Sequence, residues 1–515
     1  MVIQPNGFDH AALSVAVFAP AVGAVVLGAL PKAEETLIKG WALAVSLFTV
    51  GVCVWILFRF DYHQASSPQL EVNKAWINVI NSRYHMFVDG IGLPLFILSA
   101  VITTLCIVYS WDHFPEPHNP KAFLMLLLVL ETGMLGTFAA EDLILFFVFF
   151  ELVLLPMYFM IGVWGGERRQ YASIKFFLYT LFGSALMILA FLALYYRGGH
   201  TFDIPTLAAA TSPVRNLSHG TQLLMFGGLF MGFAIKVPMF PFHTWLPDAH
   251  TEAPTVGSVI LAAVLLKLGT YGFIRIALPV LPYAARQFAP WIAVLATIGI
   301  IYGALCCLAQ TDLKRLIAFS SVAHMGFVML GIATLTTYGI DAAIFGMVAH
   351  GLITGMLFFV AGSIGERYGT RELKRLGGLL VQAPKLGWIL GFCAMASLGL
   401  PGLAGFWGEF PAILSTFQPA PGLSRPLFLT CMVIASVGTV LAAAYLLWMF
   451  QRTAFGLPKE EFVDAHIHDI HLPEWIAWTP LLVGIVVFGV VPGLIFKITD
   501  PAVQGVASAF GSLAK

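Results

Sequence analysis

Charged residues are scarce in this chain, and their scarcity excludes most soluble folds. Only 10% of the 515 residues are Asp, Glu, Lys or Arg, whereas 59% are hydrophobic, and the mean hydropathy is +0.87. A soluble globular domain usually carries about 25% charged residues. The 27 basic and 27 acidic residues cancel, so the net charge gives no reason to expect nucleic acid or an acidic substrate as a partner. The composition is that of a membrane protein.

Cysteine is also rare, and motifs for redox cofactors are missing. No pair of cysteines shows the CxxC spacing of a zinc or iron–sulfur site. All six lie inside apolar runs, and we interpret them as small core residues: Cys53, Cys106, Cys306, Cys307, Cys393 and Cys431. The sequence also lacks a GxGxxG, P-loop, CxxCH or Ser/His/Asp arrangement in a plausible loop. The start, MVIQPNGFDH, has no basic region typical of a cleavable signal peptide. We therefore predict that the chain carries no metal or redox cofactor.

Long apolar runs dominate what is present. A helix needs about 20 apolar residues to cross the roughly 30 Å of hydrocarbon in a bilayer. Runs of that kind cover residues 9–30, 37–59, 88–110, 121–140, 142–164, 171–196, 220–246, 253–278, 288–309, 313–335, 340–365, 385–417, 427–455 and 474–497. A polar insert separates the second run from the third. The predicted fold class is an all-α polytopic membrane protein with about 14 transmembrane helices.

The predicted spans divide the chain into four parts. Residues 1–120 hold three N-terminal spans, residues 121–280 and 281–456 hold five spans each, and residues 457–515 hold a loop and the last span. In each group of five, the fourth span is broken by glycine and proline. A unit with an odd number of spans would place its second copy upside down in the membrane, so we predict two inverted five-helix repeats. The alternative is coincidence, because proline is common in membrane helices.

Basic residues in the joints predict the orientation. One side has many of them, and the other side has fewer, such as Arg197, Arg215 and Arg425, spread over longer loops. Lys and Arg favour the cytoplasmic side, and an even number of spans brings both termini to the opposite side. We predict a multi-pass protein of the bacterial inner (cytoplasmic) membrane with both termini on the periplasmic side.

Several ionisable residues lie at membrane depth, where a charge is costly and its default interpretation is functional. Lys236 stands just before the break at Pro238, and Glu409 follows the break at Pro401. A helix breaks inside a membrane only against protein or a wet cavity, and a matched pair of breaks indicates a transport site. The other ionisable residues inside predicted spans are Glu131, Glu151, Lys267, His324 and His350.

These residue types suit a proton relay. A relay needs groups whose two protonation forms are close in energy. Burial disfavours the charged form of carboxylates and amines, and histidine titrates near neutral pH. In a close Glu151–Lys236 pair each partner keeps the other charged, and the lysine can pass its proton inward when they part. For His324 and His350 a structural hydrogen bond is an equally good interpretation. For Lys236 and Lys267 it is much weaker, because burying an amine is expensive.

Three polar stretches leave alternatives open. HIHDIH at 466–471 looks like a metal cluster, but it lies in a charged joint, where a solvated loop is the better interpretation. QTDLKRL at 310–316 is expected to start a cytoplasmic helix, and proton uptake and interface anchoring explain its charges equally well. His243 and Asp248 either line an entrance or hold a turn together.

Three blocks of sequence resemble a known family. They are KVPMFPFHTWLPDAHTEAPTVGSVILAAVLLKLGTYGF (236–273), DLKRLIAFSSVAHMGFVMLG (312–331) and GLPGLAGFWGEF (399–410). They closely resemble the antiporter-like subunits of respiratory complex I, the NADH:quinone oxidoreductase, and with the span plan the resemblance covers essentially the whole chain. Glu409 stands where the L- and N-type subunits have lysine, which is the mark of the M-type branch, chain 4. The sequence also ends shortly after its last predicted span, without the long lateral helix of the L-type subunit.

The resemblance implies a non-redox, proton-translocating subunit coupled at a distance to the reduction of quinone by NADH. It implies other membrane subunits as partners, including the L- and N-type subunits, with flavin, iron–sulfur clusters and quinone bound elsewhere in the complex. It also assigns roles to the seven buried residues: Glu151 and Lys236 form the coupled pair, Lys267, His324 and His350 the central relay, Glu409 the exit-side acid, and Glu131 supports Glu151.

Three alternatives stay open. The nearest is a subunit of a multi-subunit sodium/proton antiporter, although Glu409 and the HTWLPDAHTEAPT block argue against it. Related hydrogenase-linked or chloroplast-type complexes use such chains with ferredoxin or another donor in place of NADH. The most distant is a stand-alone solute carrier, which would need polar contacts for a substrate, whereas the polar groups here are titratable and strung along the chain.

Overall fold

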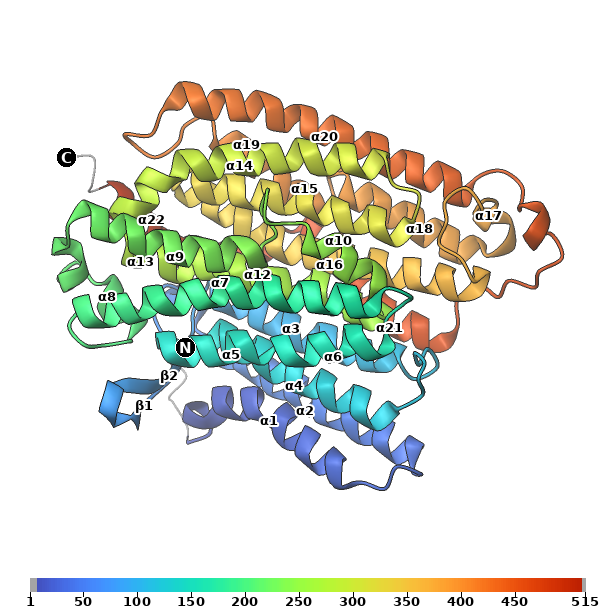
Figure 1. Ribbon diagram of the computed structural model, residues 1–515, viewed down its shortest axis with the longest axis horizontal. Helices are drawn as coiled ribbons and strands as arrows, with labels where there is room; N and C mark the ends of the chain where they lie inside the picture. Colours follow the sequence, from blue (N-terminus) through green and yellow to red (C-terminus); the bar gives the residue numbers. More distant parts are fainter. Residues whose placement is uncertain (1–6, 512–515) are drawn as a thin grey trace.

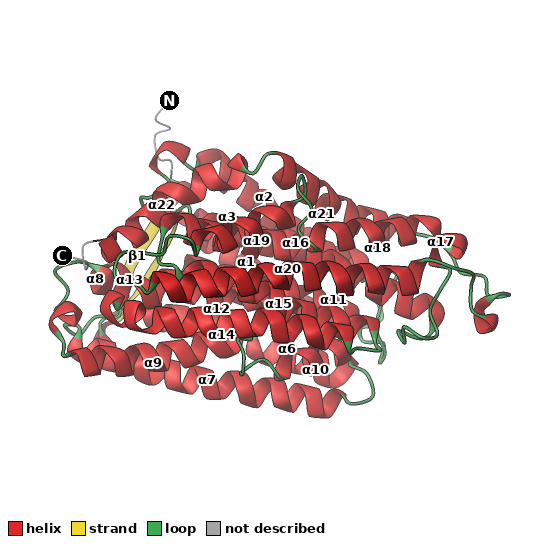
Figure 2. Ribbon diagram, turned by 90° about the horizontal axis from the view of Figure 1, so that it is seen from above, coloured by secondary structure: helices red, strands yellow, loops and turns green. Residues whose placement is uncertain are grey.

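Long apolar helices lie side by side and form nearly all of the structure, a computed structural model that describes residues 7–511 (Figures 1 and 2). Within these residues, 12 helices are long and apolar enough to cross a membrane. They are α1 (Asp9–Ala29), α2 (Glu35–Arg59), α3 (Gly92–Tyr109), α4 (Pro120–Ala139), α5 and α6 (Leu143–Leu152 and Leu154–Trp164), α7 (Arg169–Arg197), the segment from α11 to α13 (Thr255–Val280), α14 (Pro282–Leu308), α15 (Leu313–Ala333), α16 (Thr337–Tyr368), α20 (Arg425–Ala454) and α21 (Leu472–Val490). The predicted all-α membrane fold class is confirmed.

Two further helix pairs are interrupted at the predicted breaks. The first consists of α9 (His219–Lys236) and α10 (Trp245–Glu252), and the second of α18 (Pro384–Ser397) and α19 (Ala404–Ser415). A broken helix leaves backbone carbonyls that need new partners. Trp245 Nε1 donates to the carbonyl oxygen of Ile235 at 2.9 Å, and so satisfies one such group. In the second break, Gly399 and Gly402 adopt φ values of +82° and +93°, which are accessible to glycine at little cost.

The remaining elements are short or lie outside the bundle. Antiparallel strands β1 (Gln69–Ile77) and β2 (Ser82–Val88) form a hairpin with Asn81 left-handed (φ +50°) before β2. The polar insert between the second and third spans is therefore a β-hairpin. Short helices α8 (Ile204–Ala208) and α17 (Leu379–Gln382) lie between longer ones.

The prediction of the last span, 474–497, is wrong at its C-terminal end. Helix α21 stops at Val490, and a separate amphipathic helix, α22 (Gly493–Gly511), follows. Proline cannot continue the hydrogen-bond ladder of a helix, so Pro492 marks the boundary.

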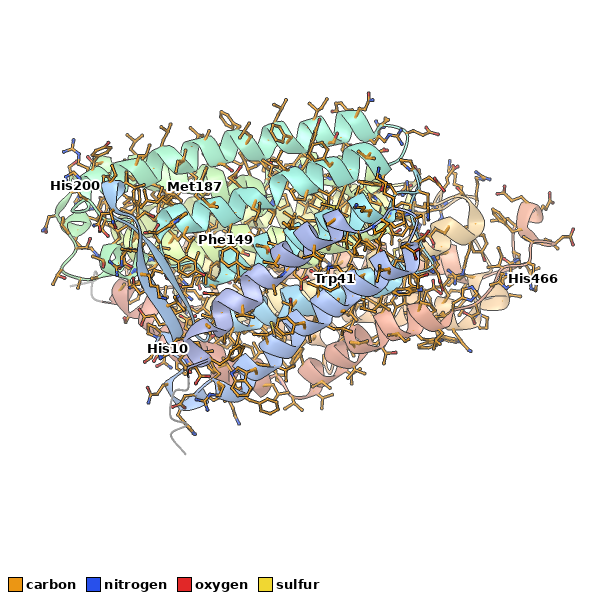
Figure 3. The ribbon with its side chains drawn as sticks, turned by 90° about the horizontal axis from the view of Figure 1, so that it is seen from below. His10, Trp41, Phe149, Met187, His200 and His466 are labelled. Carbon is orange, nitrogen blue, oxygen red and sulfur yellow. The ribbon has the colours of Figure 1, made fainter. Side chains whose placement is uncertain are left out.

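The two ends of the bundle differ. The hairpin, α8, α13 (Leu278–Val280) and α22 gather at one end, which we call the hairpin end, and α17 lies at the other, the α17 end (Figure 1). The side-chain view places His10 and His200 toward the hairpin end and His466 at the α17 end (Figure 3). The first residue of α1 and the last of α22 both lie at the hairpin end (Figures 1 and 2).

Burial identifies the centre of the bundle. In the most apolar 18-residue stretch of α15 and of α16, 100% of the residues are buried, and in that of the α11–α13 segment 94% are buried. In the corresponding stretch of α20 only 28% are buried. Helix α7 packs on the broken helix α9, and α16 packs on the broken helix α19. The three innermost spans carry Lys267, His324 and His350.

Candidate functional site

Lys267 occupies the centre of the bundle between two π-helical segments. It lies on α12 (Leu266–Gly272), flanked by the π segments Leu261–Leu265 and Phe273–Ala277. Such wider turns occur frequently at functional sites. The side chain is completely buried, and its ammonium donates to the carbonyl oxygen of Ala262 and lies 2.7 Å from His350 Nδ1. A central lysine is thus in direct contact with a histidine.

A small cavity separates His350 from His324. The ring centroids are 6.0 Å apart, and His350 Nε2 is buried without a hydrogen-bond partner among the described residues. The cavity has a volume of about 20 Å³ and is also lined by Thr354 and Ser397. One water molecule needs roughly 10–15 Å³ of such space and at least two polar partners. The two histidines therefore enclose room for one bridging water.

His324 connects this cavity to Glu409. Its Nδ1 lies 2.5 Å from Glu409 Oε1, while its Nε2 lies 3.1 Å from Ser397 Oγ and 3.2 Å from the hydroxyl of Tyr445. Glu409 also lines a groove of about 480 Å³ between α19 and α20. Lys267, His350, His324 and Glu409 thus form one line from the centre of the bundle to its side, which we call the central line.

Lys236 stands apart from the central line and from its predicted partner. It ends α9 and is buried, with its ammonium 4.9 Å from the centre of the Phe150 ring, a cation–π arrangement. No nitrogen–oxygen distance of 4.0 Å or less joins it to Glu151 in the described chain, and Glu151 instead accepts a hydrogen bond from Ser184. The predicted pair lies on neighbouring elements without an ion contact.

A glycine brings the Lys236 backbone close to the Lys267 helix. A Cβ atom at Gly269 would lie 2.7 Å from the carbonyl oxygen of Phe233 and 3.1 Å from Lys236 Cβ. Only glycine allows this close approach of α9 to α12. The two lysines therefore stand on helices in van der Waals contact.

Glu131 lies away from the other six predicted residues. It is completely buried on α4, and its Oε1 accepts a 3.2 Å hydrogen bond from Ser46. Its Oε2 has no hydrogen-bond partner in the part of the chain that the structure describes. The structure places this carboxyl beside α2 and brings no relay residue into contact with it.

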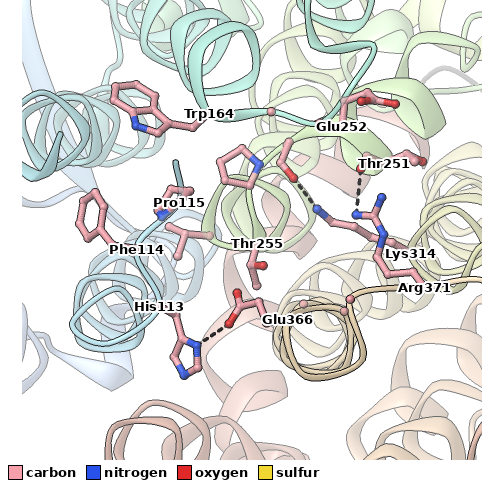
Figure 4. A pocket seen from close by; sticks show the side chains of 18 of the residues that line it. His113, Phe114, Pro115, Trp164, Thr251, Glu252, Thr255, Lys314, Glu366 and Arg371 are labelled. Atoms are coloured by element: carbon pink, nitrogen blue, oxygen red, sulfur yellow. Dashed lines mark hydrogen bonds and ion pairs between the residues drawn. The ribbon is translucent and has the colours of Figure 1, made fainter. Parts of the chain in front are cut away.

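A large polar cavity opens at the α17 end, and we call it the vestibule (Figure 4). Its volume is about 690 Å³, and His113, Glu252, Glu366 and Arg371 are among the residues that line it. At its wall, Lys314 is buried and donates to the carbonyl oxygen of Ala253. Lys314 is therefore buried inside the protein, which disfavours the interface-anchoring interpretation for this residue.

Asp312 of the QTDLKRL stretch and Asp248 also have structural partners. Asp312 caps α15 by accepting from the backbone N–H of Arg315 at 2.8 Å, and it pairs with Arg371 at 3.3 Å. Asp248 pairs with Lys175 at 2.7 Å, which supports the interpretation that it holds a turn in place.

The sequence-based predictions missed His250. Both of its ring nitrogens are buried without a hydrogen-bond partner among the described residues, and its ring stacks on Phe358 with 4.5 Å between centroids. The next residues, Thr251 and Glu252, line the vestibule, and Phe358 follows His350 by two turns on α16. His250 thus lies between the vestibule and the central line. It sits just after a helix break, where the sequence alone favours a loop.

A second missed cluster closes the hairpin end. Arg275 bonds to both carboxylate oxygens of Asp89, at 2.8 and 2.5 Å, and lies 3.2 Å from Glu141. Nearby, His85 on β2 contacts Asp203 at 2.6 Å and Glu71 at 2.9 Å. Arg275 and Asp89 lie near the ends of predicted spans and the other four charges lie between spans, and their spacing in the sequence does not show that they meet.

The anchoring of the hairpin by His85 is expected to depend on pH. Burial alone would lower the pKa of His85, but the carboxylates of Asp203, Glu141 and Glu71 outweigh it and raise the pKa above its ordinary value. The stabilisation is complete below the pKa of an unfolded histidine, about 6.5, and is lost as pH rises through the raised value. Amide hydrogen exchange of residues 82–88, corrected for intrinsic rates, should accelerate over that rise.

His85→Gln should remove this pH dependence, whereas the matched control His63→Gln, at an exposed histidine, should keep it. If the corrected amide exchange rates of β2 in the unmodified protein did not change with pH, His85 would not hold the hairpin.

The HIHDIH stretch is a loop. His466, His468 and His471 are exposed, and no group of three or more His, Cys, Asp or Glu side chains suited to a metal ion occurs in residues 7–511. Asp469 bonds to the backbone N–H groups of Lys385 and Leu386 at the start of α18. The solvated-loop interpretation agrees with this arrangement.

Family profiles match most of the chain. Residues 140–447 match the family described as NADH:quinone oxidoreductase/Mrp antiporter, TM, and residues 44–137 match NADH-ubiquinone oxidoreductase chain 4, amino terminus. Subunit M of the NADH-quinone oxidoreductase of Rhodobacter capsulatus is 40% identical over 520 residues, with 98% of each chain covered. Chain 4 of the NADH-ubiquinone oxidoreductase of Chondrus crispus is 39% identical, covering 92% of this chain and 93% of that protein.

Solved structures share the fold. A chain of respiratory complex I from Thermus thermophilus with bound NADH has a TM-score of 0.84 and 28% identity, covering 98% of this chain and 100% of that chain. A chain of the Mrp complex from Dietzia sp. has a TM-score of 0.82 at 22% identity, covering 96% of this chain and 52% of that chain. At that identity the second likeness concerns the fold alone.

The fold and the buried charges define an antiporter-like membrane subunit. The relatives specify the branch: the chain belongs to the family of NADH:quinone oxidoreductase subunit M, also called chain 4.

Proposed function

We propose that the chain translocates protons within a bacterial NADH:quinone oxidoreductase and itself carries no redox centre. Flavin, iron–sulfur clusters and quinone belong to partner subunits, and the L- and N-type antiporter-like subunits are its membrane neighbours. Family membership supports this assignment, and the central line supports the proton as the transported ion.

The central line is the observation that carries the proposal. Lys267 contacts His350, room for one water separates His350 from His324, and His324 contacts Glu409. Each group exchanges a proton with its neighbour over one hydrogen bond or one water, which is the reach that proton transfer requires. Protons move from Lys267 to Glu409 along this line.

Lys236 and Glu151 act as the switch in this proposal. While the pair makes no ion contact and Glu151 is held by Ser184, the carboxylate stabilises the ammonium of Lys236 less than it would in direct contact. The cation then gives its proton more readily toward Lys267. Closing the pair would keep Lys236 charged, and Glu131 supports Glu151 as a further carboxylate of the first repeat.

The vestibule supplies the protons in the same proposal. Its wall holds Lys314, and His250 directly precedes wall residue Thr251 and stacks on Phe358 of α16, the helix that carries His350. The α17 end faces the cytoplasm, because the predicted basic joints lie there, and both termini face the periplasm. Twelve continuous spans and two broken ones make fourteen, arranged as two inverted five-helix repeats in which the third helix packs on the broken one.

The sodium/proton antiporter alternative conflicts with the chemistry of the central line. Sodium sites are built from oxygen ligands, often the carbonyls of unwound helices. Three of the four groups in the line present nitrogen, and Lys267 already holds the carbonyl of Ala262. Protons suit these groups better than sodium does.

The cation is tested in the complete complex. A complex purified through a tag on this chain should contain flavin and iron–sulfur partners. In vesicles it should build the same pH gradient from NADH and quinone when sodium is replaced by potassium or choline. A saturable sodium requirement, with sodium-22 uptake that survives a protonophore, would overturn the proton assignment.

A further inference from the structure

A cavity of about 770 Å³ opens on the flank of the α17 end, where α2 and α4 begin and α6 ends. It shares only Trp164 with the vestibule. Its lining separates into a polar rim and an apolar floor, exemplified by Lys32, His118 and Lys121 at the rim and Met125, Phe159 and Val163 on the floor. We propose that this α2–α4–α6 pocket binds one anionic diacyl phospholipid.

The rim carries uncompensated positive charge. Lys32 has no hydrogen bond or ion pair among the described residues. Lys121 Nζ makes one bond, to the carbonyl oxygen of Leu30 at 2.6 Å, which leaves two ammonium hydrogens for a ligand. Glu35 also lines the rim, but Lys39 at 2.6 Å and His118 at 3.0 Å already compensate it. The two lysines are therefore available to a phosphate.

The start of α4 adds to this charge. Asn119 caps the helix by accepting from the backbone N–H of Ala122, and Pro120 is its first residue. The N-terminus of a helix carries about half a positive charge and is suited to phosphate binding. Because Lys121 sits in this first turn, side chain and backbone attract an anion to the same place.

The floor continues from the rim along the helices. On α4, Met125 follows Lys121 by one turn, and on α6, Phe159 precedes Val163 by one turn. Phe159 is 46% and Val163 is 37% exposed, so these side chains face outward as the wall of a groove. An acyl chain can lie along them while its head group contacts the lysines.

The combination selects a lipid. A free phosphate would use the rim and leave the floor in contact with bulk lipid, whereas a zwitterionic lipid would place a positive choline near two lysines. Basic pockets between transmembrane helices on the cytoplasmic side commonly bind acidic head groups. The site shares only Trp164 with the vestibule and contains none of the titratable residues of the proposed proton path, so its test is independent of the proposed function.

Lipid binding can be measured on the intact complex by native mass spectrometry, with mixed micelles of phosphatidylglycerol or phosphatidylcholine as probes. Lys32→Gln should weaken phosphatidylglycerol binding by about 5-fold, and Lys32→Gln with Lys121→Gln by about 25-fold, because each basic side chain near the surface contributes about a factor of 5. The matched control, Lys374→Gln with Lys459→Gln, removes two exposed charges at the same end and should change nothing.

A variant that fills the apolar floor of the pocket distinguishes binding of a lipid from binding of a free phosphate. Ala122→Phe keeps both lysines but blocks the groove, and it should reduce phosphatidylglycerol binding while leaving glycerol phosphate binding unchanged. Lys32→Gln has no internal bond to lose, so it remains informative even if removal of Lys121 disturbs folding. The proposal would be overturned if the unmodified complex bound phosphatidylcholine as strongly as phosphatidylglycerol, or if Lys32→Gln left phosphatidylglycerol binding unchanged.

Discussion

Lys236→Arg is expected to stop proton translocation while the complex still assembles. Arginine keeps the positive charge and the stacking on Phe150, but it does not deprotonate in proteins. A positioned proton donor contributes roughly 100-fold to a transfer step, so gradient formation should fall by more than about tenfold. NADH-driven quinone reduction should fall with it, because the proposed function couples electron transfer to pumping. Lys236→Ala should give a similar loss through removal of the charge.

The measurement compares the rates of NADH oxidation and vesicle acidification in the same preparation. Lys39→Arg is the matched control, since Lys39 pairs with Glu35 and donates to the carbonyl oxygen of Trp111, and arginine carries the charge and the donors for both contacts. A Lys236→Arg complex that acidifies vesicles at the normal rate would remove this lysine from the relay.

Glu409→Gln is expected to block the end of the central line. The amide has nearly the same shape as the carboxyl and can still accept a hydrogen bond from His324, which Glu409 contacts at 2.5 Å. It cannot take up a proton, so pumping should fall by more than about tenfold on the same reasoning as for Lys236. Glu409→Asp keeps the carboxyl but shortens its reach by one methylene, and should retain part of the activity.

Glu461→Gln is the control for the two Glu409 variants. Glu461 is an exposed carboxylate bound to Arg375, and exposed ion pairs contribute little, so its loss should leave turnover unchanged. A Glu409→Gln complex that builds a full gradient would make Glu409 a structural acid.

The sequence predicted the helices and the buried charges for a common physical reason. A charge inside an apolar run is costly enough to need a purpose, and the runs themselves reveal the spans. Helix α2, predicted at 37–59, covers Glu35–Arg59, and α16, predicted at 340–365, covers Thr337–Tyr368. The contacts that join Lys267, His350, His324 and Glu409 connect three helices and the end of a broken one, and helical periodicity gives no distances between helices.

Other features left no comparable signal. Ser397 and Tyr445, which hold His324, are ordinary residues of a membrane helix until they are seen beside it. The hairpin was missed because a polar stretch of about twenty residues has little hydrophobic contrast. Pro492 and Gly493 indicate a helix boundary after Val490. The prediction of one span over 474–497 followed the hydropathy of the run instead.

The two π segments around Lys267 have a consequence for the evolution of this helix. A π turn holds about one residue more than an α turn, and each residue of an α-helix rotates the side-chain direction by about 100°. A π turn thus completes one full rotation with one extra residue, and deleting one residue from Leu261–Leu265 or Phe273–Ala277 would restore a plain α turn while the two flanking halves keep their directions. A single-residue gap inside either π segment would therefore leave the direction of Lys267 unchanged, so descendants of this sequence can lose one residue there and still place the lysine against His350.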